Sequence, residues 1–201
     1  MYITLNYLKH RMGKGASIVF CTSTAGLEWK KFKREQNKVV HSKTWEEVQE
    51  VTKKLASSAP ATFAYMYSKR CLSQFICEQS VEFAKMGIRM NNVLPASTDT
   101  GMKQEFQNMV GSEEGLIAQA GLAGRLATSE EMASPMVFLN SDMASFVSGL
   151  DMVVDYTDTC LKVLGKKKNI EAVSATNPII CALAKKMLNQ SAKKALNSGK
   201  E

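Results

Sequence analysis

Residues 63–95 read FAYMYSKRCLSQFICEQSVEFAKMGIRMNNVLP, and this stretch decides the fold class. Its first part, 63–86, is the longest helical pattern in the chain, with apolar side chains recurring at helical spacing. Gly87 follows where a helix commonly ends on a glycine. The apolar run that comes next predicts a strand, which Pro95 ends. We therefore expect a long helix followed at once by a strand.

Two further strands and two further helices are expected around this stretch. Residues 17–22, SIVFCT, form a short apolar and β-branched run, which is typical of a strand buried in a parallel sheet. We expect a last strand at 150–155 and helices at 2–12 and 128–139. Helix, strand, helix, strand, helix, strand is the order that βαβ units with right-handed crossovers produce. The fold class is therefore α/β, with a parallel sheet flanked by helices.

Two segments between the expected strands are irregular. Residues 28–60 are polar and charged, and we interpret them as an insertion that carries one helix. Thr44 and Glu47 make a capping box at its start. An apolar stripe follows the box and consists of Trp45, Val48, Val51 and Leu55. Residues 101–121 show no firm pattern, and we expect a mobile loop with helical pieces there.

The bulk properties indicate one globular domain. A length of 201 residues suits a single core, and 45% hydrophobic with 22% charged residues is ordinary for such a domain. No apolar run is long enough to span a bilayer, and residues 1–15 are too polar for a signal peptide, so we expect a cytoplasmic protein. The five cysteines fall at irregular spacings beside two histidines. This pattern indicates no metal site and no disulfide framework, and we expect reduced, mostly buried thiols.

The positive charge is concentrated at one end of the chain. Residues 157–201 contain nine lysines and three acidic residues, a net +6 of the total +7. We therefore expect a solvated, lysine-rich extension and no nucleic-acid partner. Residues 179–196 combine four lysines with an apolar stripe, which predicts an amphipathic helix packed on the body of the protein or on a second subunit. The stripe consists of Ile180, Leu183, Met187 and Leu188. Binding to a membrane surface or to a calmodulin-like protein is the alternative.

Tyr65 and Lys69 are four residues apart at the start of the long helix, so their side chains share one face. Alone, this spacing is uninformative, because both residue types are common enough for a chance match. Further segments occur around the pair in a definite order. They are G-x-S-I-V with Ser23 after it, G-I-R-M-N-N-V-L-P at 87–95, D-T-G-M at 99–102, and G-R-L-A-T-S-E-E-M-A with F-L-N-S-D, ending in S-G-L-D-M-V-V-D.

In this order and spacing, the segments between residues 1 and 156 resemble the short-chain dehydrogenase/reductase family. The resemblance implies the C-terminal half of a Rossmann-type fold, with Ser23, Tyr65 and Lys69 as catalytic residues. It implies a small-molecule alcohol or ketone as substrate and NAD or NADP as cofactor, with Tyr65 and Lys69 contacting the cofactor. The long stretch between Ser23 and Tyr65 is similar to an insertion in bacterial 3α-hydroxysteroid dehydrogenases. That similarity points toward steroids or other bulky alcohols.

The turn after the second strand carries the remaining cofactor contacts that the resemblance implies. Pro95, Thr98 and Thr100 would hold the nicotinamide end of the cofactor. The sequence departs from the family pattern at two positions of this turn. Ala96 stands where the family has a glycine, and Thr98 stands where the family has an aliphatic residue.

The acid-base chemistry of this set can be stated independently. Hydride transfer to a carbonyl needs a proton donor at the developing alkoxide, and a phenol with a pKa of about 10 is a poor base near neutral pH. Lowering that pKa by about 3 units corresponds to roughly 4 kcal/mol, which a nearby ammonium group and a nicotinamide cofactor can supply. We therefore expect Lys69 to lower the pKa of Tyr65. We expect Ser23 to donate to the substrate oxygen; its alternative role is to satisfy backbone groups at the strand end.

The nucleotide site of the family is a Gly-rich turn between a strand and a helix N-terminus, and the printed sequence has no counterpart. We therefore expect no tight binding of NAD(H) by this chain alone, and an unpaired sheet edge at 17–22. Two hypotheses remain open. The chain is the catalytic part of an NAD(P)-dependent oxidoreductase, assembled as a homodimer or homotetramer, or it is a truncated, non-catalytic oligomerisation partner of a full-length homologue.

Overall fold

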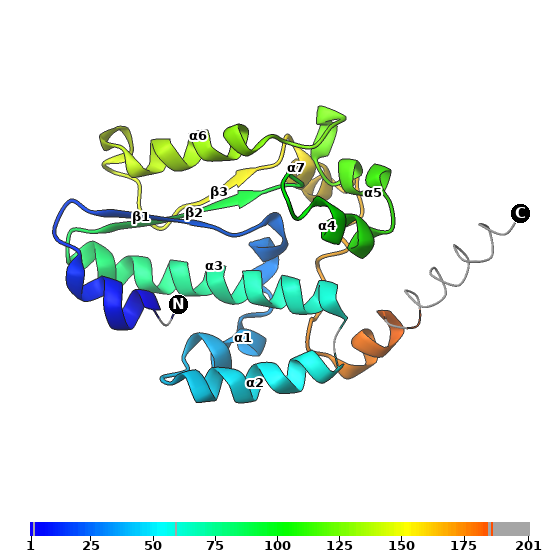
Figure 1. Ribbon diagram of the computed structural model, residues 1–201, viewed down its shortest axis with the longest axis horizontal. Helices are drawn as coiled ribbons and strands as arrows, with labels where there is room; N and C mark the ends of the chain where they lie inside the picture. The colour runs from blue at the N-terminus through cyan, green and yellow to red at the C-terminus, as the bar shows by residue number, and fades with distance from the viewer. Residues whose placement is uncertain (2, 59, 185, 187–201) are drawn as a thin grey trace, which may run out of the picture.

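The computed structural model describes residues 1, 3–58, 60–184 and 186. A three-stranded parallel sheet lies at its centre, in the order β1 (Ser17–Cys21), β2 (Arg89–Pro95) and β3 (Asp151–Val154) (Figure 1). β2 is the central strand, and β1 and β3 each pair with it. The predicted α/β class and all three predicted strands are confirmed. Each strand lies within one residue of its expected bounds.

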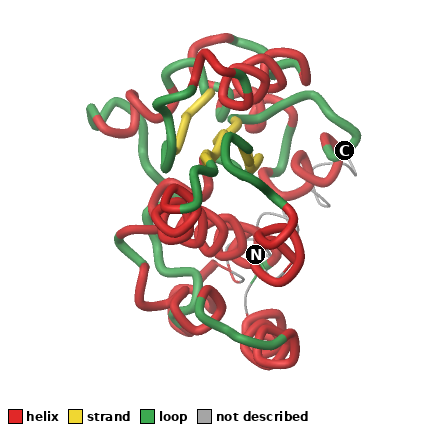
Figure 2. Tube along the Cα trace, turned by 90° about the vertical axis from the view of Figure 1, so that its left-hand side faces the viewer, coloured by secondary structure: helices red, strands yellow, loops and turns green. Residues whose placement is uncertain are grey.

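Helices cover both faces of the sheet (Figures 1 and 2). α3 (Ala61–Lys85) packs on one face, where the rings of Phe20 and Phe75 meet edge to face with centroids 6.3 Å apart. α6 (Ser129–Asn140) packs on the other face, where Leu139 joins Val93 in a second apolar cluster. Fully buried apolar side chains on both sides of the strands therefore hold the layers together, as expected for a parallel sheet.

α3 ends where the sequence predicts. Gly87, two residues beyond the helix, has a φ of +73°, a conformation that favours glycine because it has no Cβ. The Gly87 carbonyl accepts from the backbone N–H of Gly15 at 2.8 Å, which brings the start of β2 beside the start of β1. The turn between α3 and β2 thus fixes the register of the first two parallel strands.

The prediction of one helix in the 28–60 insertion is wrong. The structure has a 3-10 helix, η3 (Thr24–Lys30), and two α-helices, α1 (Lys33–Val40) and α2 (Trp45–Ser58). The sequence of α1 is mostly polar because few of its residues pack against the protein core. Val39 and Val40 do so, and they are buried in the apolar cluster around α3. Both α-helices lie on the side of α3 away from the sheet (Figure 1).

The expected loop at 101–121 contains helices, as predicted in outline. They are α4 (Lys103–Val110), α5 (Glu113–Ala118) and the 3-10 turn η4 (Gly121–Ala123). α6 then begins with a complete capping box between Thr128 and Glu131. At the other end of the chain, the predicted helix at 2–12 is wound differently, with one π-helical turn, η1 (Thr4–Leu8), and one 3-10 turn, η2 (Lys9–Arg11).

The expectation of a solvated extension after residue 156 holds only for part of its described residues: Lys166 and Lys168 are exposed, whereas other residues pack on the domain. A short helix, α7 (Asp158–Val163), is followed by a segment that runs past the N-terminal end of α3 toward α2 (Figure 1). Within it, Ala175 is fully buried and the side chain of Lys162 is only 9% exposed. Residues 178–184 are helical, which confirms the start of the helix predicted at 179–196. Its continuation, with Met187 and Leu188, lies outside the described residues.

The expectation about the cysteines is wrong in one respect. The cysteines are unbridged, but only Cys71 and Cys181 are buried, so the expectation of mostly buried thiols is wrong. Cys21 and Cys160 are exposed.

Tyr67 is buried, and its hydroxyl donates to the backbone oxygen of Glu35 at 3.0 Å. In the described part of the chain, no helix combines the length and the apolar character needed to cross a bilayer.

Candidate active site

A cleft of about 760 Å³ opens at the carboxyl end of the parallel strands. This is the edge at which open α/β sheets hold their ligands. All of the predicted site residues are among its lining: Ser23, Tyr65, Lys69, Pro95, Thr98 and Thr100. They come from the ends of β1 and β2 and from the first turns of α3, so the fold brings together residues that are up to 77 positions apart in the sequence.

Tyr65 and Lys69 share one face of α3, as their spacing predicts. The Lys69 ammonium lies 5.3 Å from the centroid of the Tyr65 ring, above its face. Phe106 of α4 contacts the same ring edge to face, with centroids 5.4 Å apart. The phenol is therefore held between a cation and an aromatic ring, with its hydroxyl in the cleft beside Ser23.

Ser23 has the backbone contact that the sequence indicated as its alternative role, and donation to a substrate oxygen stays a prediction. Its hydroxyl accepts from the backbone N–H of Ala25 at 3.2 Å and so caps η3. The same hydroxyl makes a side-chain hydrogen bond with Tyr65. The capping contact fixes the serine at the end of β1, where it faces the phenol.

The pKa of Tyr65 differs from the expectation. Burial raises it above its ordinary value, the hydrogen bond with Ser23 works in the opposite direction, and the charges of Cys21 and Glu171 raise it further. Burial also lowers the pKa of Lys69, an effect that the nearby Cys21 opposes. The expectation that Lys69 lowers the pKa of Tyr65 is therefore wrong. The ammonium sits over the ring face, and desolvation of the phenol dominates.

The turn after β2 is fixed by backbone contacts. Ala96 donates its backbone N–H to Val154 at 3.0 Å, and Thr98 bridges to Ala127 in a short parallel pairing. The Thr98 hydroxyl donates to the Ala96 oxygen at 3.0 Å, so this side chain is used within the turn. The Thr100 hydroxyl is exposed and accepts from the backbone N–H of Met102 at 3.3 Å. Thr100 can therefore still reach a ligand, whereas Thr98 contributes mainly shape.

A buried polar network behind the cleft was not predicted. Asn92 donates to Asp151 at 2.8 Å and to Ser73 at 3.3 Å, and its oxygen accepts from Thr22 at 2.8 Å. The Trp29 indole donates to the other Asp151 oxygen at 3.3 Å. These bonds join β2, β3, α3, η3 and the residue that follows β1, so they hold the two segments that carry Ser23 and Lys69 at a fixed separation. The sequence shows that polar residues lie in the strands, but it does not show which residues they would hydrogen-bond.

Gly26 makes the same junction tight. A Cβ at this position would lie 2.6 Å from the Ser73 hydroxyl and 3.1 Å from the Lys69 backbone oxygen. Only glycine allows η3 to pass this close to α3. Gly26, three residues after Ser23, therefore lies in close contact with the turn of α3 that carries Lys69.

Most of the remaining cleft lining is apolar and was also missed. It includes two phenylalanines and five methionines, namely Phe63, Phe106, Met66, Met102, Met109, Met132 and Met136. Methionine side chains are flexible and polarisable and adapt to ligands of irregular shape. Ile170, Glu171 and Ala184 complete the lining from the segment after α7, for which no sequence motif exists.

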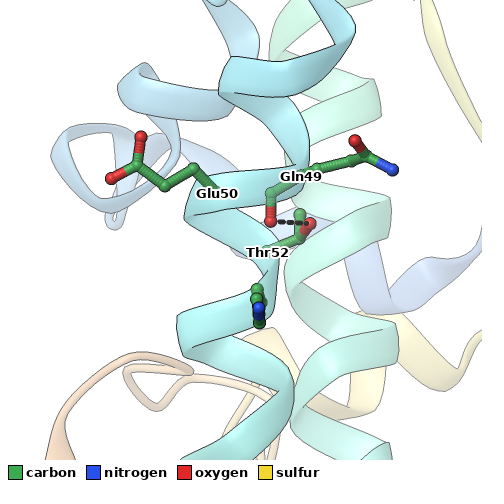
Figure 3. Close-up of a pocket in the computed structure, with 4 residues that line it drawn as sticks. Gln49, Glu50 and Thr52 are labelled. Carbon is green, nitrogen blue, oxygen red and sulfur yellow. Dashed lines mark hydrogen bonds between the residues drawn. The ribbon is translucent and has the colours of Figure 1, made fainter.

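A second concave region of about 630 Å³ lies on α2 and is lined by Gln49, Glu50, Thr52 and Lys53 (Figure 3). The Thr52 hydroxyl donates to the backbone oxygens of Val48 at 2.8 Å and Gln49 at 3.3 Å. These residues come from little more than one turn of one helix. None of the predicted site residues lies there, so the chemistry concentrates in the cleft at the sheet edge.

The comparisons with known proteins agree with this geometry. The family model described as enoyl-(acyl carrier protein) reductase matches residues 51–156, which is more than half of the chain. Cyclopentanol dehydrogenase of Comamonas testosteroni is 37% identical over 97 residues, 48% of this chain and 38% of that protein. Short-chain dehydrogenase srdC of Neurospora crassa is 31% identical over 98 residues, 49% of this chain and 36% of that protein.

Solved structures give the same class. A short-chain dehydrogenase family protein from Francisella tularensis aligns with a TM-score of 0.54 at 25% identity, over 78% of this chain and 56% of that chain. The 3-alpha-hydroxysteroid dehydrogenase from Pseudomonas sp. B-0831, complexed with NADH, aligns with a TM-score of 0.60 at 19% identity, over 78% of this chain and 60% of that chain. The fold is thus of the Rossmann type. The chain belongs to the short-chain dehydrogenase/reductase family, and it spans less than two fifths of the length of the two curated relatives above.

Proposed function

We propose that this chain provides the catalytic side of an oxidoreductase site that interconverts a secondary alcohol and a ketone with NAD or NADP. One observation carries the proposal: Ser23, Tyr65 and Lys69 meet in a single cleft at the carboxyl end of the parallel strands. A relative with 37% identity over about half of this chain is named cyclopentanol dehydrogenase, which supports the reaction class.

The chemistry of the three side chains follows from their surroundings. The raised pKa keeps the Tyr65 phenol protonated near neutral pH, so it can donate its proton to the oxygen of a ketone. The Ser23 hydroxyl beside it would hold the same oxygen. The Lys69 ammonium lies over the ring of Tyr65, where it would hold the ribose hydroxyls of the cofactor. A bound nicotinamide cofactor supplies or accepts the hydride.

The residues of the cleft fit the nicotinamide end of that cofactor. Lys69 forms no ion pair with a carboxylate among the described residues, so its ammonium is available for ribose hydroxyls. Tyr65 lines the cleft next to it, and Pro95, Thr98 and Thr100 form the turn that would meet the nicotinamide. The turns that follow the three strands read TSTAG, ASTDTG and DYTDT, and none is the Gly-rich turn that receives a pyrophosphate. Weak binding of NAD(H) by this chain alone therefore stays a prediction.

The lining of the cleft supports a bulky, mostly apolar substrate. Apolar side chains, among them five methionines and two phenylalanines, form most of its walls beyond the polar end at Ser23 and Tyr65. Hydroxysteroids and other ring alcohols belong to this chemical class, and we propose them as the first substrates to test.

Assembly as a homodimer or homotetramer also stays a prediction. Exposed apolar side chains on η1, on α3 and directly after α3 support it, because exposed apolar surface favours association. They include Tyr7, Leu8, Val81 and Met86. The expected cytoplasmic location stays a prediction as well.

The test is hydride transfer by the 201-residue chain and its Tyr65→Phe variant, followed by NADH and NADPH absorbance with cyclopentanone and a 3-ketosteroid. Removing the proton donor should lower turnover by about 10²–10⁴-fold without unfolding the chain. Tyr67→Phe, on the same helix, is the matched control, because its buried hydroxyl donates to the backbone oxygen of Glu35 and Tyr67 is not among the residues that line the cleft.

Two results would contradict the proposal in different ways. Equal turnover of the wild-type chain and Tyr65→Phe would remove Tyr65 as the acid. No hydride transfer by the wild-type chain with either cofactor would favour the alternative, in which the chain acts only by associating with a full-length homologue.

A further inference from the structure

The segment after α7 forms one wall of the cleft, and a buried arginine holds it there. Arg70 of α3 is fully buried, with its guanidinium carbon 4.4 Å from the centroid of the Phe32 ring. The guanidinium donates to the backbone oxygens of Glu171 and, at 3.0 Å, of Val173. Arg70 is adjacent to Lys69 in the sequence, so the backbone at 171–173 is tied directly to the turn of α3 that carries the proposed site.

The side chain of Glu171 lies in a defined electrostatic setting. Its carboxylate is 18% exposed and accepts from the Lys162 ammonium at 2.8 Å through Oε2. Lys162 is shared, because it also pairs with Asp158 at 2.8 Å. Glu171 still acts on the cleft, since its negative charge contributes to the raised pKa of Tyr65.

Glu171 and Lys69 are the two charged residues among the described residues that line the cleft. They stand at different places in it. Lys69 lies over the Tyr65 ring at the reacting end, whereas Glu171 belongs to the wall that closes the cleft from the other segment. The other lining residues are uncharged and largely apolar, and the Lys162 ammonium at 2.8 Å offsets part of the Glu171 charge.

We propose that Glu171 is a specificity-determining residue of this site. Its carboxylate disfavours substrates that carry a carboxylate or phosphate, and it accepts a hydrogen bond from a hydroxyl or ammonium group at the part of the substrate that meets this wall. The inference rests on the proposed function, because it takes this cleft as the substrate site. A like charge in a partly desolvated cleft is rejected strongly, which makes such discrimination effective.

The test uses three ring alcohols that differ only in their second group. These are 4-hydroxycyclohexanecarboxylate, cyclohexane-1,4-diol and trans-4-aminocyclohexanol. Binding to the full chain is measured as protection of Cys21 from iodoacetamide, because Cys21 is exposed and lines the cleft. Cys160, which is exposed and is not among the lining residues, is the internal reference in the same peptide map.

The wild-type chain should bind the diol and the amine about tenfold more tightly than the carboxylate. Glu171→Gln should bring the three affinities within about twofold of one another, and Glu171→Asp should keep the wild-type order. Glu46→Gln, on the exposed first turn of α2, is the charge-matched control and should behave as wild type. Unchanged low reactivity of Cys181, which is 3% exposed, will show that the segment stays in place in the variants.

The outcomes separate this inference from the proposed function. Equal protection by all three ligands in the wild-type chain, or an unchanged order in Glu171→Gln, would overturn the role of Glu171 and leave the hydride-transfer proposal standing. Protection by none of the three would overturn the role of Glu171 as well. Hydride transfer to cyclopentanone would then decide separately whether the site is catalytic.

Discussion

The two sides of the cleft are held in place by different interactions. On the side of the sheet and α3, fully buried apolar residues pack across the layers, among them Phe75, Phe83 and Met90. On the side of the segment after α7, charged groups dominate. Lys162 pairs with Asp158 and Glu171 at 2.8 Å each, and Arg70 binds two backbone oxygens of the segment.

This difference predicts different responses to mutation and to pH. Apolar burial is non-directional and depends little on pH, so the sheet side should unfold only with the whole domain. Ion pairs and hydrogen bonds are directional and depend on charge, so the segment can be released locally while the core stays folded. Two buried cysteines report on the two sides separately. Cys71 lies within α3 and Cys181 within the segment.

The largest effect is expected for Phe75→Ala. The side chain is 1% exposed between α3 and β1, so its removal leaves a cavity in the layer contact. The free energy of unfolding in urea should fall by about 3–5 kcal/mol. Cys71 and Cys181 should become reactive together. A loss below about 1 kcal/mol would show that this contact does not support the fold.

Arg70→Leu should release the segment and spare the core. The change leaves the backbone oxygens of Glu171 and Val173 without their donor, a loss of about 2–3 kcal/mol. Alkylation of Cys181 should accelerate by at least about tenfold, while Cys71 stays protected. Arg11→Leu, on the exposed surface of η2, is the control. Parallel exposure of both cysteines in Arg70→Leu would mean that the two sides are one cooperative unit.

The smallest expected effect is the pH dependence of the segment. Burial by itself lowers the pKa of Lys162, but the carboxylates of Glu171 and Asp158 outweigh it and hold the pKa above the ordinary 10.5. Since the folded-state pKa is raised, the stabilisation is fully present below the ordinary pKa and is lost as pH rises through the folded value. The Cys181 rate relative to exposed Cys160 should therefore increase by about threefold between roughly pH 9 and pH 11.

The matched variant for that measurement is Lys162→Met, in which the relative rate should no longer change with pH. Cys71 should remain unreactive throughout, because burial raises its pKa to about 12. A flat profile in the wild-type chain would contradict the role given to the ion pairs.

Much of the fold and of the site could be predicted because the signals were local. The long helix, Gly87 and the three strands follow from apolar periodicity and a glycine with positive φ. Tyr65 and Lys69 share a face because helical spacing requires it. α1 escaped prediction, because Val39 and Val40 are buried by α3, which is distant in the sequence, and not by a stripe of their own helix.

Glu171 marks the limit of what the sequence could say about the site. It stands in a lysine-rich stretch whose composition predicts exposure, and no motif surrounds it. Its position follows from Arg70, 101 residues earlier, whose buried guanidinium binds the backbone of the segment. The acceptors are backbone oxygens, which every residue has, so the identities of the residues in the segment do not predict this contact.

The sequence by itself therefore determined the α/β class, the three strands and the face that carries Tyr65 and Lys69, because periodicity and spacing act over a few residues. Only the tertiary structure decided that Ser23 meets Tyr65, that burial raises the pKa of the phenol, and that Glu171 lines the cleft. These properties depend on desolvation and on contacts between distant segments, and both exist only once the layers have packed.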